Sequence, residues 1–176
     1  MKKLVGSVVL PVVGLALLAG CAPTGGTAAI VNGVEIPDSR IVQATEGCAS
    51  VLREFGVTEG QMRLQVVRWA VIDEVASQFV ATSDLKPTDA EILAEARAEG
   101  AEAFLADARC GQLTSGVLRY NLLAAALAES GEEWPQTFRA PDIEINPRYG
   151  VWDPSSLTLV NTGSLSQFDE NYRPRA

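Results

Sequence analysis

The chain of 176 residues carries 14 basic and 22 acidic side chains and contains no histidine. This length corresponds to one domain with a substantial hydrophobic core. The acidic balance argues against nucleic acid as a partner, because phosphates bind patches of lysine and arginine. The lack of histidine removes the usual catalytic triads, imidazole metal sites and the commonest general base. We therefore expect no enzyme, no metal and no cofactor.

Residues 1–20 have the pattern of a secretory signal peptide. Lys2 and Lys3 precede a run from Leu4 to Gly20 without a charged residue, and small residues close that run. The stretch from Leu18 to Cys21 resembles the lipobox of bacterial lipoproteins, which implies cleavage before Cys21 and lipid attachment at this cysteine. Several acyl chains give durable membrane anchoring. The alternatives are an uncleaved membrane anchor and an ordinary signal peptide followed by a chance cysteine.

A lipobox implies an extracytoplasmic location, on the outer face of the bacterial cell membrane or on an outer membrane where the envelope has one. Residues 21–27 are then a short tether. With Cys21 assigned to lipid, Cys48 and Cys110 remain as an even pair and are predicted to form a disulfide in an oxidising compartment. Closing their loop would stabilise the fold by about 4 kcal/mol. The alternative is a pair of buried thiols.

Residues 28–36 predict a β-hairpin, because two β-favouring runs flank Asn32-Gly33, the strongest local signal for a tight hairpin turn. Asp38 or Ser39 is expected to cap a helix that continues to about Phe55.

A second helix is predicted from a cap at Thr58 to about Ala81, with Gln61 in the capping-box position. Its apolar residues exceed a single face, so we interpret it as the central core helix. The alternative is that part of this face, including Trp69, lines a groove for apolar ligands.

The third helix is predicted from a cap at Thr88 to about Arg109, with Gly100 as a weak point and Gly111 closing it. Thr114 or Ser115 is expected to cap a fourth helix that ends near Ser130.

Beyond Gly131 the chain changes character, because Pro135, Pro141, Pro147 and Pro154 disfavour helices. Residues 143–145 and 157–160 have strand-like patterns, whereas residues 161–176 are polar and predicted to be disordered. The segment from Asn146 to Gly150 fits a turn with a packed tyrosine. The sequence thus predicts a mainly α fold with a small β-sheet (α+β) and about four helices.

Acidic pairs such as Asp73-Glu74 and Glu132-Glu133 are interpreted as solvated charge, not as an acid/base dyad.

Several segments together resemble the N-terminal chaperone region of the SurA/PrsA family of extracytoplasmic folding factors. They are AAIVNGVEIPDSRI, VIDEVA, LKPTDAEI and INPRYGVWD. The resemblance implies that residues 28–160 form a chaperone domain, in which residues 29–32 pair with residues 143–145. The best-known members of this family carry one or more parvulin-type isomerase domains, for which this chain has no room, so isomerase activity is not expected from the resemblance.

The expected function is that of a membrane-anchored chaperone-like lipoprotein whose partners are unfolded secreted proteins. The aromatic side chains proposed to contact such clients are Trp69, Phe79, Tyr120 and Trp134. One alternative is a dedicated protein-interaction subunit of an envelope complex, and another is a degenerate foldase. The oligomeric state stays open.

Overall fold

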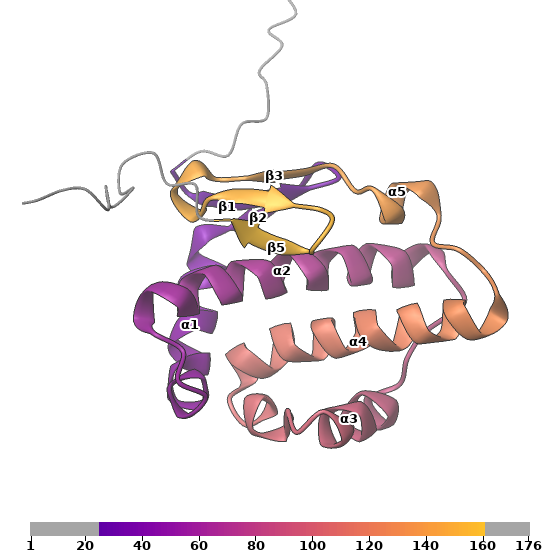
Figure 1. Ribbon diagram of the computed structural model, residues 1–176, viewed down its shortest axis with the longest axis horizontal. Coiled ribbons are helices and arrows are strands. Elements are labelled where there is room, and N and C mark those ends of the chain that lie inside the picture. Colours follow the sequence, from indigo (N-terminus) through magenta and orange to yellow (C-terminus); the bar gives the residue numbers. More distant parts are fainter. Residues whose placement is uncertain (1–24, 161–176) are drawn as a thin grey trace, which may run out of the picture.

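The computed structural model describes residues 25–160, which form a helical body covered on one side by two small antiparallel sheets (Figure 1). The predicted signal peptide, Cys21 and the predicted tail lie outside the described residues. The α+β fold class is confirmed. The helices are α1 (Asp38–Glu54), α2 (Glu59–Thr82), α3 (Asp89–Ala98), α4 (Ala108–Ser130) and α5 (Gln136–Arg139), with the 3-10 turns η1 (Glu102–Leu105) and η2 (Pro147–Tyr149). The strands are β1 (Thr27–Val31), β2 (Val34–Pro37), β3 (Ile143–Ile145), β4 (Val151–Asp153) and β5 (Thr158–Val160).

The larger sheet has the order β2-β1-β3, with β1 between the other two strands. The pairing of Ala29 with Ile145 and of Val31 with Ile143 joins two ends of the described chain. This confirms the long-range pairing that the family resemblance implied. It also explains how β1 satisfies its backbone groups while nearly all of it is buried. The strand begins at Thr27, which was expected to belong to the tether.

The hairpin between β1 and β2 turns at Asn32 and Gly33, as predicted, and both residues have positive φ, 48° and 82°. These values fit the tight turn that suits twisted strands. The side chain of Asn32 has further contacts. Its Nδ2 donates to Gln78 Oε1 on α2 (2.9 Å), and its Oδ1 accepts from the backbone of Asp142 (2.9 Å). The hairpin tip is therefore tied to the core helix and to the segment before β3.

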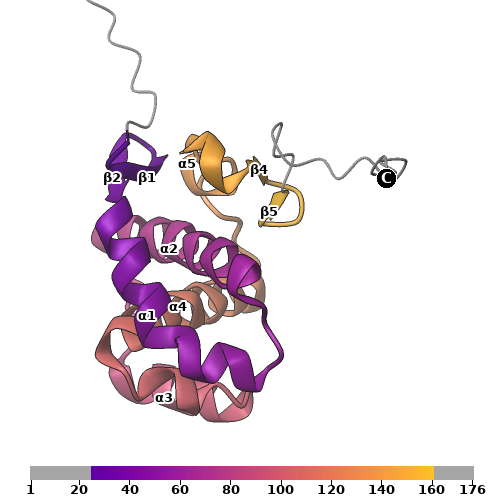
Figure 2. The same ribbon diagram turned by 90° about the vertical axis from the view of Figure 1, so that its left-hand side faces the viewer.

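Helix α2 is the central element, which confirms its interpretation as the core helix. Figure 1 and Figure 2 both show the sheets on one side of α2 and α4 on the other, with α3 beyond α4. Ten of its residues are buried, in keeping with contacts to α1, α4, β1 and β5. Thr58 caps it as expected, and its backbone N–H donates to Gln61 Oε1 (3.0 Å).

The predicted boundary between the third and fourth helices is wrong. Helix α3 ends at Ala98 and Gly100 follows with φ of 68°, so the weak point is where the helix terminates. Helix α4 then begins at Ala108, because Asp107 caps it by accepting hydrogen bonds from the backbone N–H groups of Arg109 and Cys110. Gly111, expected to end a helix, lies inside α4.

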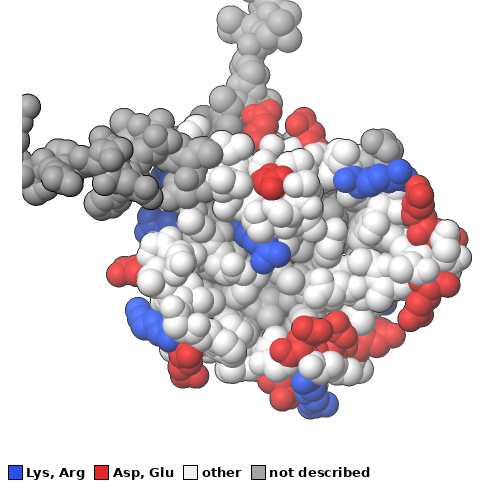
Figure 3. Space-filling model, viewed as in Figure 1, with Lys and Arg blue, Asp and Glu red and all other residues white. Residues whose placement is uncertain are grey.

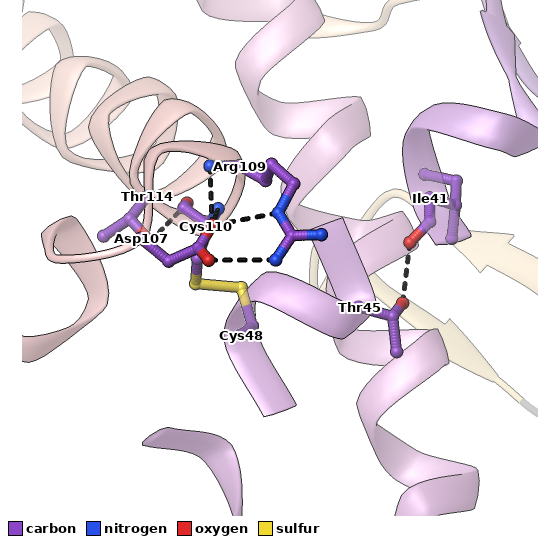
Figure 4. The surroundings of a disulfide bond; sticks show 7 residues. All are labelled: Ile41, Thr45, Cys48, Asp107, Arg109, Cys110 and Thr114. Carbon is purple, nitrogen blue, oxygen red and sulfur yellow. Dashed lines mark hydrogen bonds and ion pairs between the residues drawn. A yellow bond between two sulfur atoms is a disulfide. The ribbon is translucent and has the colours of Figure 1, made fainter. Parts of the chain in front are cut away.

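Cys48 on α1 and Cys110 on α4 form a disulfide, as predicted, with a Cα–Cα distance of 4.9 Å (Figure 4). Both cysteines are buried. The neighbouring Gly47 lies so close to Asp107 that a Cβ at position 47 would be 2.5 Å from the Asp107 Oδ1 atom. The disulfide therefore joins two helices whose backbones already approach closely.

Three further expectations change. Helix α1 begins at Asp38 itself, and Pro37 occupies the cap position. A short helix, α5, follows Pro135, because proline lacks only an N–H that the first turn leaves free. The strand predicted at 157–160 forms as β5, but its partner β4 was not predicted. The turn at 146–150 does contain a buried tyrosine, Tyr149, whose hydroxyl donates to the Asp38 carboxylate.

Candidate functional site

The four aromatic residues singled out from the sequence separate into two places. Tyr120 on α4 stacks on Trp134 with ring centroids 5.1 Å apart, and Phe79 on α2 meets the edge of Trp134 at 4.9 Å. Trp69 instead contacts Phe104, at 5.5 Å. The structure therefore assembles Phe79, Tyr120 and Trp134 into one cluster and leaves Trp69 outside it.

Phe138 on α5 completes this aromatic cluster, with its ring 5.2 Å from that of Phe79. Sequence reasoning missed Phe138, because a four-residue helix among prolines has no apolar periodicity to detect. Phe79 is 4 % exposed, and the rings of Trp134 and Phe138 pack against its buried side chain. Tyr120 and Trp134 are only partly buried. Within the cluster, these two are the partly accessible members among the residues that the sequence indicated.

An apolar groove of about 260 Å³ opens beside this cluster, and we refer to it below as the groove. Helix α2 contributes its floor through Val71, Ile72 and Val75. The walls come from α4, α5 and the strands near the end of the described chain. Their lining residues include Tyr120, Trp134, Phe138, Ile143, Trp152 and Leu157. Arg139 is the one charged residue among those that line the groove.

Two features of the groove wall are costly for the fold. Trp152 Nε1 is buried and has no hydrogen-bond partner within the described residues, and an unsatisfied buried donor destabilises a fold. Leu157 has a φ of 51°, a left-handed conformation that side-chain-bearing residues rarely adopt. Its carbonyl accepts a hydrogen bond from Arg68 Nε (2.6 Å). Such features concentrate at functional sites.

Charged side chains of both signs surround the groove. Arg139 is engaged by the Glu133 carboxylate at 2.5 Å and by the Trp134 carbonyl at 3.3 Å. Asp153, on β4, accepts hydrogen bonds from the side chains and backbone around Ser155 and Ser156, which lower its pKa to about 2. It is therefore ionised at any physiological pH.

Figure 3 shows the face of Figure 1. Uncharged atoms cover most of the area over α2, acidic atoms lie both at the level of the strands and, in a larger group, lower down over α3 and α4, and basic atoms interrupt the uncharged area.

A buried polar cluster lies apart from the groove, between α1, α2 and α4. It shows that the interpretation of Asp73 as solvated charge is wrong. Asp73 is 6 % exposed. Its carboxylate pairs with Arg40 at 2.5 Å and with Arg119 at 3.6 Å. Burial raises the pKa of this carboxyl, and the two guanidinium groups oppose that shift. The arrangement joins three helices, and we assign it a structural role.

The described residues include no group of three or more histidine, cysteine, aspartate or glutamate side chains placed to hold a metal ion. Among the helices of residues 25–160, none is both long and apolar enough to cross a membrane.

No protein-family model matches the chain, and comparison with curated proteins and with solved structures also gave no match. The resemblance to the SurA/PrsA chaperone region therefore stays a prediction.

Proposed function

We propose that this chain is a membrane-anchored, extracytoplasmic chaperone-like lipoprotein that binds unfolded or extended segments of secreted proteins and has no isomerase activity. The groove is the observation that carries the proposal. Its apolar lining, with one charged residue at its edge, offers an area where apolar side chains of a client leave water. Tyr120 and Trp134 provide large, flat and partly exposed surfaces for such contacts.

The anchor would hold this groove near the membrane surface. Five residues separate Cys21 from Thr27, where the central strand β1 begins, and the six steps from one Cα to the next span at most about 20 Å. A client leaving an export channel in the same membrane would therefore meet the groove early. This part of the proposal depends on lipid attachment at Cys21.

Aggregation of reduced, denatured lysozyme tests the proposal, with the full-length protein reconstituted in lipid nanodiscs. We expect suppression of aggregation near equimolar ratio, and a weaker effect for Trp134→Ala. Trp69→Ala is the matched control, because Trp69 is also a partly buried tryptophan but does not line the groove. Circular dichroism checks that both variants fold. Wild-type protein without effect on aggregation would contradict the proposal.

A second candidate is a dedicated interaction subunit of an envelope complex. The distribution of exposed apolar side chains favours it, because outside the groove the large ones are scattered over several elements. A general holdase gains from a broad apolar patch, whereas one small groove suits one short segment of a single partner. Affinity capture distinguishes the two. One stoichiometric partner and no binding of denatured lysozyme would support the interaction subunit.

A further inference from the structure

The outer edge of β3 has backbone groups that the sheet does not use. Asn32 N donates to Asp142 O (2.7 Å), and Asn146 N donates to Ala28 O (2.9 Å). In an antiparallel ladder, hydrogen-bonded and non-hydrogen-bonded pairs alternate. With Glu144 opposite Ile30, the N–H and C=O groups of Ile143 and Ile145 therefore point away from β1. Within residues 25–160 these groups have no hydrogen-bond partner.

This free edge borders the groove. The side chain of Ile143 lines it, and so does Trp152 on β4, which contacts β3. Trp152, whose buried Nε1 has no hydrogen-bond partner within the described residues, therefore lines the same groove as Ile143. A sheet edge of this kind binds an extended segment by main-chain hydrogen bonds, and an adjacent pocket selects alternate side chains.

The charges on these strands indicate what kind of segment fits. Asp142 and Glu144 are exposed, and Asp153 stays ionised. None of the three forms an ion pair with a lysine or arginine of the described chain. A segment with basic flanking residues would complement them, whereas acidic flanks would be repelled.

We infer that the groove binds its ligand as an added strand: an extended peptide with alternating apolar side chains and basic flanks pairs with the free edge of β3 and continues the sheet β2-β1-β3. This inference rests on the proposed function and gives it a recognition mode. Main-chain hydrogen bonding places little demand on the sequence of the peptide, and the side chains in the groove supply affinity. The carboxylates of Asp142, Glu144 and Asp153 select against acidic segments.

The test uses a peptide of eleven residues, in which three valines alternate with four threonines and two lysines stand at each end. It is titrated against the full-length protein in nanodiscs. Single N-methylation removes one N–H from the peptide. In an added strand only alternate N–H groups face β3. A peptide methylated at one of these alternate positions should therefore bind about tenfold or more weakly. A peptide methylated at an intervening position should bind about as tightly as the unmethylated parent peptide. Lysine flanks should bind about tenfold more tightly than glutamate flanks at low salt.

Two measurements on the protein accompany the peptide series. Amide hydrogen exchange at Ile143 and Ile145 should slow by about tenfold or more at saturating peptide. The double variant Asp142→Asn/Glu144→Gln should reduce the preference for lysine flanks. Glu99→Gln, which removes an exposed carboxylate at the C-terminal end of α3 outside the groove lining, should not change it.

The outcomes separate the two proposals. A peptide that binds without a period-two effect of N-methylation, and without protection of Ile143 and Ile145, would overturn strand addition while the groove function stands. Equal binding of lysine-flanked and glutamate-flanked peptides would overturn the inferred charge preference. If neither the peptide nor denatured lysozyme binds, the proposed function fails and the inference fails with it.

Discussion

Gly116 lies on α4. Its replacement by alanine adds only one methyl group, but the structure predicts a large loss of stability. A Cβ atom at this position would lie 1.9 Å from Asp73 Oδ1 and 2.4 Å from Asp73 Cβ. Ordinary contacts need about 3.4 Å or more, so Gly116→Ala requires a displacement of more than an ångström. Either the Asp73 carboxylate leaves its place or α2 and α4 separate.

Both routes cost free energy of unfolding. Moving Asp73 away would leave Arg40 and Arg119 without their buried partner, and breaking such a pair costs about 3–5 kcal/mol. Separating the helices is an overpacking cost of about 1–3 kcal/mol. We expect the cheaper route or a mixture, and hence a loss of about 2–3 kcal/mol. At this chain length that loss lowers Tm by roughly 5–10 °C.

Urea unfolding followed by circular dichroism, under oxidising conditions, measures this loss. Gly60→Ala on α2 is the matched control, because a Cβ there meets nothing within 4 Å and alanine favours a helix by up to about 1 kcal/mol over glycine. The two substitutions should therefore change stability in opposite directions. If Gly116→Ala unfolds within about 0.5 kcal/mol of the wild type, the close approach of α2 and α4 at Asp73 is refuted.

Two other predictions concern the disulfide and pH. Replacing Cys48 and Cys110 together with alanine should lower the free energy of unfolding by about 4 kcal/mol, since the disulfide closes a loop with a sequence separation of 62 residues; urea unfolding of the double variant beside the wild type measures it, and a loss below about 1 kcal/mol would contradict the expectation. Burial and the Asp38 carboxylate raise the pKa of Tyr149 to about 12, so its stabilising contribution is complete below pH 10 and is lost as pH rises toward the folded-state pKa. Between pH 9 and 11 the wild type should lose roughly 1 kcal/mol more than Tyr149→Phe in urea unfolding, and parallel pH profiles of the two proteins would argue against this coupling.

The expectation for β3 shows where sequence reasoning needed outside help. Alternation of apolar and acidic residues indicated a strand at 143–145, but a pattern of three residues cannot identify its partner. The resemblance to a chaperone family supplied the pairing with 29–32, and the structure confirms it. The partners are more than 110 residues apart in the chain, so only the folded helical body brings them together.

The sequence by itself determined the local elements, because their causes are local: Asn32-Gly33 sets the hairpin turn, Thr58 and Thr88 cap their helices, and an excess of apolar residues buries α2. Tertiary structure alone decided the burial of Asp73 and the assembly of the site. Tyr120, Trp134, Phe138 and Trp152 come from different elements and meet only after folding. No spacing within one segment encodes such a meeting, because contacts between distant segments depend on how the helices pack and not on local periodicity.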